Sequence, residues 1–197
     1  MKKYITIIAG GMIFLYLGSC KPNAGKDIQP IIPSDIDYLE RGEEIKTAVF
    51  NVLSQNLKSA LEKGGIETAI AYCNIAAMPL VDSLSIDHNA IIKRTSQRLR
   101  NPDNNADESE NSMLSRFEAQ MMSGQVIKPV LEETKGEVTY YAPILTNNFC
   151  LQCHGIPGQT LTEANNDLIK SFYPQDSAIG YSEGELRGIW SIKFDKK

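Results

Sequence analysis

The feature that most restricts the fold is a short cluster of metal-binding side chains in the C-terminal third of the chain. Cys150 and Cys153 enclose two residues, and His154 follows directly, in the stretch NNFCLQCHGIPG. Gly155 and Pro157 come next and argue against an immediate helix. The spacing raises the question of whether this segment is a haem attachment site, a metal site, a redox dithiol or a coincidence.

Four interpretations of this motif compete. A thioredoxin-like dithiol would leave His154 without a role. A structural zinc ion needs four ligands, which Cys73, Cys150, Cys153 and His154 could supply, although adjacent ligands have an awkward geometry. A disulfide could join any two cysteines. Haem c attachment uses every part of the motif, because both thiols bond to the haem and the adjacent histidine binds the iron. The motif therefore predicts one covalently bound haem c, attached at Cys150 and Cys153, with His154 as an iron ligand.

The N-terminus has the pattern of a bacterial export signal, which suits covalent haem. Lys2 and Lys3 precede an apolar run over residues 4–18. The run is shorter than the roughly 20 residues of a comfortable membrane-spanning helix. It ends in LGSC, which resembles a lipobox, and this predicts a lipoprotein signal peptide over residues 1–19 and a lipid on Cys20. The alternative is an uncleaved anchor with an incidental cysteine.

Charge and composition narrow the classes of partner. Residues 21–34 contain three prolines and no amphipathic period, so they are interpreted as a tether. Loss of two lysines with the signal peptide leaves 18 basic and 24 acidic residues, a net charge of −6. An acidic exported domain is a poor nucleic-acid binder. We expect a periplasm-facing lipoprotein of the cell envelope, on the outer or the inner membrane, with one domain over residues 35–197.

The rest of the chain predicts an α+β domain. Apolar residues at the helical period indicate a helix from Ser34 or Asp35 to the Gly64–Gly65 pair, and a second helix from about residue 66 to 84. Its apolar stripe contains Cys73, and Pro79 is expected to kink it or to start a new turn. Strands are expected over residues 89–96, 137–147 and 187–194, and Pro143 should interrupt the second strand or lie at an edge. A capping box at Asp107 predicts a third helix that ends at Gly124.

A haem iron bound by His154 has a second axial position. The candidates are Cys73, His88 and the methionines after the signal peptide, and each also has an ordinary structural explanation as a core or surface residue. Spacing alone ranks them nearly equally. The methionines are Met78, Met113, Met121 and Met122.

Four stretches occur together in this order: AIAYCNIAA, IIKRTSQRLRNPDNNAD, YYAPILTNNFCLQCHG and YPQDSAIGYSEGELRG. Together they resemble the single-haem, PAS-like domain family typified by a cyanobacterial "Tll" haem protein. The resemblance runs from about residue 35 to 194. It implies a PAS-like antiparallel sheet with long N-terminal helices around the haem, His154 as proximal ligand and Cys73 as distal ligand. The signal peptide and tether are additions to that domain.

Basic residues follow the first predicted strand in KRTSQRLRN. Arginine pairs well with carboxylates, so Arg94 or Arg100 could hold the haem propionates; the alternative is a solvated basic loop. Iron and nearby cations are expected to lower the pKa of Cys73, so that it binds as thiolate. Tyr140, Tyr141 and Trp190 are most simply core or sheet residues.

An iron with two protein ligands has no open coordination site, and the sequence offers no separate acid–base constellation, so we expect neither an enzyme nor a small-molecule substrate. Two roles remain. The domain could sense redox state or a gas, with Cys73 leaving the iron on reduction, and would signal through an unknown partner. Alternatively, it could relay electrons in the envelope as a small cytochrome c. A weaker alternative, a non-haem cysteine–histidine metal or disulfide module, predicts a colourless protein.

Overall fold

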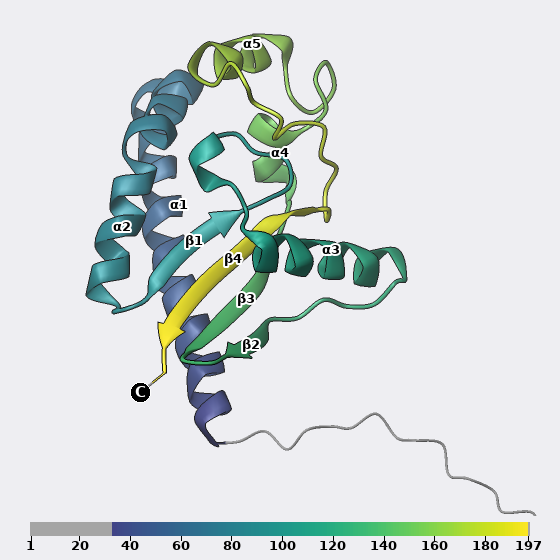
Figure 1. Cartoon of the computed structure of the whole chain (residues 1–197). Coiled ribbons are helices and arrows are strands. Elements are labelled where there is room, and N and C mark those ends of the chain that lie inside the picture. The colour runs from purple at the N-terminus through teal and green to yellow at the C-terminus, as the bar shows by residue number, and fades with distance from the viewer. Residues whose placement is uncertain (1–32, 197) are drawn as a thin grey trace, which may run out of the picture. The chain divides into compact units, whose positions relative to one another are not determined.

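The computed structural model describes residues 33–196, with side chains from residue 37 onward (Figure 1). The predicted signal peptide, Cys20 and nearly all of the tether lie outside the described residues. The elements in chain order are α1 (Pro33–Ile75), α2 (Ala77–Asp87), β1 (Ile91–Thr95), the 3-10 helix η1 (Pro102–Asn104), α3 (Glu108–Met122), β2 (Val130–Thr134), β3 (Glu137–Leu145), α4 (Asn148–His154), α5 (Glu163–Phe172) and β4 (Leu186–Asp195).

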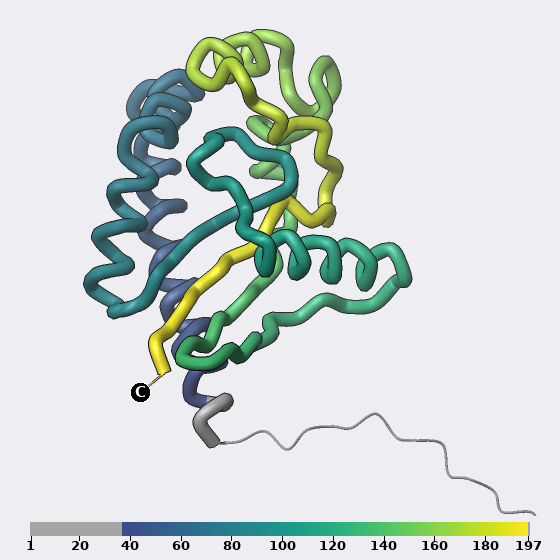
Figure 2. Tube along the Cα trace, viewed as in Figure 1, coloured from purple at the N-terminus to yellow at the C-terminus, as the bar shows by residue number. Residues whose placement is uncertain are grey.

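The strands form one antiparallel sheet in the order β1-β4-β3-β2. The C-terminal strand, yellow in Figure 2, therefore lies between β1 and β3. Pro143 of β3 pairs with Ile189 of β4 at a position beyond the pairing with β2, which ends at Tyr141. The missing proline N–H thus removes no ladder bond to β2, as the sequence predicted for an edge position.

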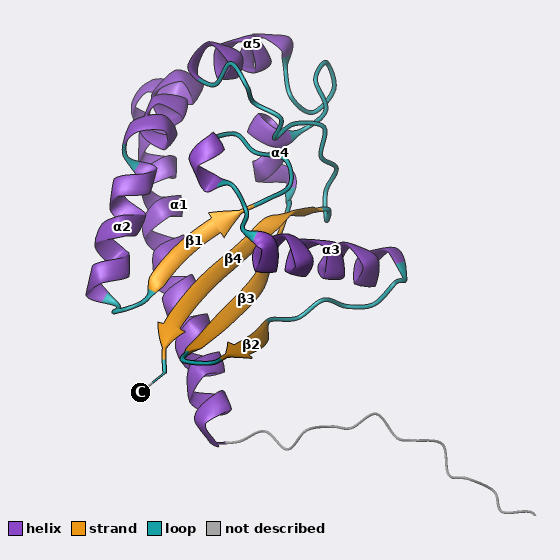
Figure 3. Ribbon diagram, viewed as in Figure 1, coloured by secondary structure: helices purple, strands orange, loops and turns teal. Residues whose placement is uncertain are grey.

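Helices cover both faces of the sheet (Figure 3). The pleat alternates the side chains, so Tyr140 and Ile192 face α1 and α2, whereas Tyr141 and Ile189 face α3. The predicted α+β class is confirmed, with an antiparallel sheet and long N-terminal helices. Arg41 of α1 also donates a hydrogen bond of 3.0 Å to the carbonyl of His88, at the end of α2.

The first helical region is broken where the sequence predicted. Gly64 and Gly65 have non-helical backbone angles inside α1, and Gly65 has a φ of 66°. The second predicted helix is itself divided, because α1 ends at Ile75 and α2 begins at Ala77, with an angle of 49° between them. Pro79 lies in the first turn of α2, where its missing N–H costs little.

Other elements match or extend the prediction. Asp107 and Glu110 form the expected capping box at the start of α3. The prediction omitted β2 and α5, and it did not place the cysteine motif on the short helix α4. Among the described residues, no single helix is long and apolar enough to cross a membrane, and one bent pair, residues 37–75 with 77–87, meets that test by length and composition.

Candidate haem site

The cysteine motif occupies α4, which the sequence locally defines. The side chain of Asn147 caps the helix by accepting a 3.2 Å hydrogen bond from the Cys150 N–H. Gly155 ends it in extended conformation, and a Cβ there would collide with Thr160. Residues three and four apart share one face of a helix, so Cys150 presents to the same side as Cys153 and His154.

One cavity of about 170 Å³ gathers most of the predicted site. Its wall on α4 contains both motif cysteines and His154, and its wall on α1 contains Cys73. Arg100 reaches it from the loop after β1. The remaining wall is mainly apolar or aromatic and consists of Leu57, Leu61, Ile66, Ala69, Ile70, Phe149, Gln152 and Tyr173. Segments that are far apart in sequence thus bring three thiols and one imidazole to a single pocket.

The imidazole of His154 has a defined orientation. Its Nδ1 lies 2.6 Å from the carbonyl oxygen of Ala178, which can only accept, so Nδ1 carries the proton. This tautomer leaves Nε2 as a lone-pair donor. Burial lowers the pKa of His154 well below its ordinary value, and the charges of Arg100 and Arg187 lower it further. A neutral imidazole is the form that ligates metals.

The pKa of Cys73 is shifted in the direction opposite to the expected one. Burial raises the pKa of the Cys73 thiol, and this effect outweighs the lowering by Arg94 and Arg100. The sequence predicts that iron and nearby cations together lower this pKa. The two arginines alone do not lower it below the ordinary value of a thiol. Burial also raises the pKa of Cys153, which favours the neutral thiol.

The two predicted propionate arginines have different surroundings. Arg100 pairs with Asp176, with 3.2 Å between Nη2 and Oδ2, and its Nη2 also donates to the Cys153 carbonyl at 2.6 Å. Arg94 lies over the ring of Trp190, 5.6 Å from its centroid, and does not line the cavity. Within residues 37–196, no hydrogen bond or ion pair of the Arg94 side chain is found. Their role toward propionates stays a prediction.

The other axial candidates lie elsewhere. His88 is the C-cap of α2, and it does not line the cavity. Met113, a residue of α3, is buried in the second core cluster, and Met122 at the end of the same helix is 90% exposed. Met78 accepts a hydrogen bond from Asn101, and neither it nor Met121 is part of the cavity wall.

The state of the three cysteines can be described for residues 33–196. Cys73, Cys150 and Cys153 are all free thiols there. Among those same residues, no group of three or more His, Cys, Asp or Glu side chains is arranged to hold a metal ion.

Comparison with known protein families shows which family this chain belongs to. The profile of the Tll0287-like family matches residues 36–194, which is most of the chain. The chain belongs to the Tll0287-like family. The similarity noted from the sequence motifs is thereby confirmed.

A solved structure shares the fold of this Tll0287-like chain. It is described as the crystal structure of the cyanobacterial heme-protein Tll0287, and it superimposes with a TM-score of 0.57 at 19% sequence identity. The match covers 84% of this chain and 98% of the other. Comparison with curated proteins gives no match.

The residues of this Tll0287-like chain fit the requirements of haem attachment. Two thiols lie one helical turn apart on α4, and the neighbouring imidazole is neutral with Nε2 free of hydrogen bonds among the described residues. The cavity between α4 and α1 is mainly apolar, as a porphyrin requires, and holds one further thiol.

Sequence reasoning missed the residues that support His154 from the chain before β4. Ala178, Gly180 and Tyr181 contact the end of α4. The Gly180 N–H donates to the backbone carbonyl of Gly155 at 2.8 Å, and the Tyr181 N–H donates to the backbone carbonyl of His154 at 3.0 Å. The stretch YPQDSAIGY had been noted only as part of the family resemblance. A carbonyl acceptor leaves no sequence signal, whereas the buried Asp176 could have been suspected as a partner for the basic loop.

Proposed function

We propose that this chain is an exported, lipid-anchored c-type haem protein that acts in redox or gas sensing. Cys150 and Cys153 would hold one haem covalently, with His154 and Cys73 as axial ligands. The observation that carries the proposal is the single cavity whose wall contains all four side chains. The name of the structural relative, a heme-protein, supports the same cofactor.

The chain's own residues would bind the group, orient it and keep water away. The α4 thiols would provide two covalent attachments, and the Ala178 carbonyl holds His154 with Nε2 available. Leu57, Leu61 and the other apolar residues of the wall would exclude water from the porphyrin faces. When bound, haem supplies a one-electron iron centre whose thiolate ligand favours the ferric state.

Covalent attachment can be tested directly. The full chain is produced in bacteria with and without a working haem c maturation system. We expect a red protein whose haem stays attached in a denaturing gel, with a matching increase in mass. Cys150→Ala and Cys153→Ala should each lose one thioether bond, whereas Cys73→Ala should keep both. A colourless full-length protein from maturing cells would overturn the proposal.

Sensing is supported by the environment of Cys73. Burial raises the pKa of this thiol. Once released from the iron, Cys73 would therefore be protonated at neutral pH, which opposes rebinding and suits a ligand switch on reduction. The signal would pass to an unknown partner protein. The test is the reduced protein: loss of thiolate ligation together with carbon monoxide binding supports sensing.

Electron transfer is the second candidate, and the cavity rim favours it. Phe149 lines the cavity while 50% exposed, so one edge of the site is close to solvent. An exposed cofactor edge is what a small electron carrier needs. A carrier should keep both axial ligands through repeated reduction and oxidation, and carbon monoxide should then fail to bind.

Export and anchoring are separate parts of the proposal. The lipobox at residues 17–20 and the apolar run before it support a lipid on Cys20 and a cell-envelope location facing the periplasm. Wild-type protein should sediment with membranes, and Cys20→Ala should abolish lipidation. A wild-type chain without lipid would refute this part and leave the haem proposal intact. We propose neither catalysis nor nucleic-acid binding.

A further inference from the structure

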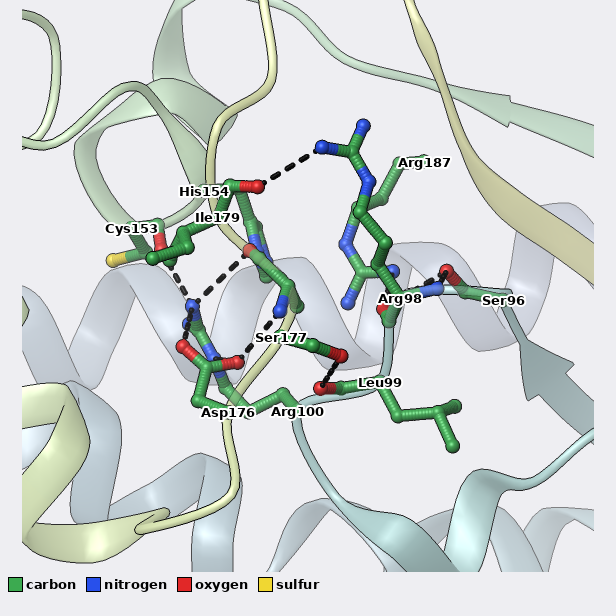
Figure 4. A network of polar contacts seen from close by, with 11 residues as sticks. Ser96, Arg98, Leu99, Arg100, Cys153, His154, Asp176, Ser177, Ile179 and Arg187 are labelled. Carbon is green, nitrogen blue, oxygen red and sulfur yellow. Dashed lines mark hydrogen bonds and ion pairs between the residues drawn. The ribbon is translucent and has the colours of Figure 1, made fainter.

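We propose that Arg100 and Asp176 are positioning residues that fix the orientation of His154 through the backbone of Ala178. This role rests on the proposed function only in that His154 is the iron ligand. We refer to the pair as the Arg100–Asp176 clamp (Figure 4).

The clamp begins at the carbonyl that holds the imidazole. Ala178 accepts the 2.6 Å hydrogen bond from His154 Nδ1. Its own N–H donates to Asp176 Oδ1 at 2.9 Å, within a tight turn. The residue that carries the acceptor carbonyl is therefore tied to the Asp176 carboxylate through its own N–H, one peptide unit before that carbonyl. A displaced Asp176 carboxylate is expected to shift the Ala178 backbone and, with it, the carbonyl that His154 contacts.

Arg100 connects the same carboxylate to α4. Its Nε and Nη2 reach the two Asp176 oxygens at 3.3 and 3.2 Å, which is the fork geometry of arginine with a carboxylate. Nη2 also donates to the Cys153 carbonyl at 2.6 Å and approaches the Ala178 carbonyl at 3.5 Å. One guanidinium thus links both ends of the hydrogen bond that orients His154.

The Arg100–Asp176 clamp is largely buried, so Asp176 depends on Arg100 for its charge pairing. The Asp176 side chain is 1% exposed and that of Arg100 is 14% exposed. In the described part of the chain, Arg100 is the one cation paired with Asp176. A buried carboxylate that loses its partner must rearrange or become protonated. Lysine at position 100 would keep the charge but not the fork, so geometry and charge can be separated.

The segment that contains Asp176 and Ala178 is also held by hydrogen bonds that do not involve the Arg100–Asp176 clamp. The Ser177 hydroxyl donates to the Leu99 carbonyl at 2.9 Å, and Arg98 donates to the Ile179 carbonyl at 3.0 Å (Figure 4). The Ser177 N–H also donates to the Leu99 carbonyl, at 2.8 Å. These bonds should hold residues 176–181 close to the loop after β1 when the clamp is removed. Loss of the clamp is then expected to loosen the imidazole without detaching the whole segment.

A hydrogen bond to the non-ligating nitrogen fixes the tautomer of a histidine ligand and increases its basicity. A weaker Nδ1 bond should make His154 a poorer electron donor. The clamp is therefore expected to stabilise the ferric state, in addition to orienting the ring. Arg100, in the loop after β1, is thereby given a role toward His154 of α4 that differs from binding a propionate.

The test uses the ring nitrogens of His154, read by nitrogen-15 NMR in the full chain produced without haem. Wild type should show a protonated Nδ1 with a hydrogen-bonded proton resonance. Asp176→Asn and Arg100→Gln should lose that resonance and mix the two tautomers, and Arg100→Lys should retain it in part. Glu110→Gln is the matched control, because it disrupts another buried ion pair, Lys93–Glu110, that is no part of the cavity wall.

The matured protein provides a second readout. The midpoint potential should rise in Asp176→Asn and stay at the wild-type value in Glu110→Gln. Unchanged tautomers in both Asp176→Asn and Arg100→Gln would overturn the proposal. If neither variant folds, the wild-type spectrum decides, since an Nε2-protonated His154 contradicts the clamp. A colourless matured protein would refute the haem proposal, and the haem-free spectra would still test the clamp.

Discussion

At the residue scale, the contact between Gly42 and Tyr140 joins α1 to the sheet. A Cβ at Gly42 would overlap the Tyr140 ring and lie 2.8 Å from its Cβ. Gly42→Ala should therefore lower the free energy of unfolding by about 1–3 kcal/mol, although alanine is the better helix former. Urea unfolding measures this. Gln55→Ala, at an exposed position of the same helix, is the control, and equal stability of the two variants would refute the contact.

Glu43, which follows Gly42 in the chain, predicts that the stability of the fold depends on pH. The Tyr140 hydroxyl donates to Glu43 at 2.5 Å. Hydrogen bonds from Lys46 and then Tyr140 hold the pKa of Glu43 below its ordinary 4.5. A depressed folded-state pKa contributes stability above the unfolded pKa, and this is lost as pH falls through the folded value.

Wild type should consequently lose stability relative to Glu43→Gln as pH falls below 4.5. The effect should stay under about 1 kcal/mol, because the Glu43 side chain is half exposed and solvent screens it. Urea midpoints of both proteins between about pH 3 and 6 provide the measurement. Parallel curves would show that Glu43 has no such role.

Individual residues differ in how well the sequence revealed them. Cys150, Cys153 and His154 were predicted as a unit because their spacing is itself the signal, and the cavity brings them together. Cys73 was one of several axial candidates, and only the family resemblance favoured it, because an apolar helix stripe looks the same whether its cysteine is a ligand or a core residue. The acceptor at Ala178 could not be predicted, because every residue carries a carbonyl.

At the scale of elements, the break in α1 positions Cys73. Gly65 has φ 66° and ψ −158°, a conformation open essentially to glycine alone. Its Cβ would meet nothing within 4 Å, so the cost of Gly65→Ala is conformational. The break separates Leu57 and Leu61 from Cys73 along the cavity wall. A straighter α1 would therefore move Cys73 relative to α4.

Gly65→Ala should lower the free energy of unfolding by about 1–3 kcal/mol and weaken the Cys73 ligand signal in the matured protein. Thermal unfolding and EPR spectroscopy measure the two effects. Lys63→Ala, at an exposed position two residues before Gly65, should change neither. A Gly65→Ala protein with normal stability and spectrum would contradict the importance of the break.

The start of α3 gives a further prediction. The Asp107 carboxylate accepts a 2.8 Å hydrogen bond from the Glu110 N–H, and the Glu110 carboxylate accepts one of 2.9 Å from the Asp107 N–H. Asp107→Ala should cost about 1 kcal/mol of stability through the lost cap. Chemical unfolding tests this, with Arg116→Ala in the exposed middle of α3 as the control. An unchanged midpoint would mean that the cap is dispensable.

Long elements were predicted better than short ones for a physical reason. The periodicity of α1 extends over many turns, and glycine pairs or capping boxes mark helix ends. In contrast, β2 has five residues without clear alternation, so its pairing with β3 determines it. The helix α5 was missed although Thr162 supplies an N-cap and Leu168, Ile169 and Phe172 recur at helical spacing.

At the scale of the whole molecule, α1 serves two cores. Its first half packs on the sheet with Val49 at the centre, and its second half lines the cavity with Cys73. The other lining residues of the cavity come from α4, from Arg100 in the loop after β1 and from Tyr173 at the end of α5. Neither packing partner of α1 is evident from sequence, because a helix periodicity shows one apolar face but not what covers it.

The central claim is that this pocket holds a haem between His154 and Cys73. The most direct measurement is the EPR and optical spectrum of the ferric full chain, matured with haem c, beside Cys73→Ala, His88→Ala and Met78→Leu. We predict a low-spin thiolate signature in wild type that only Cys73→Ala removes. A wild-type spectrum that Cys73→Ala leaves unchanged would contradict the account and return His88 and the methionines as axial candidates.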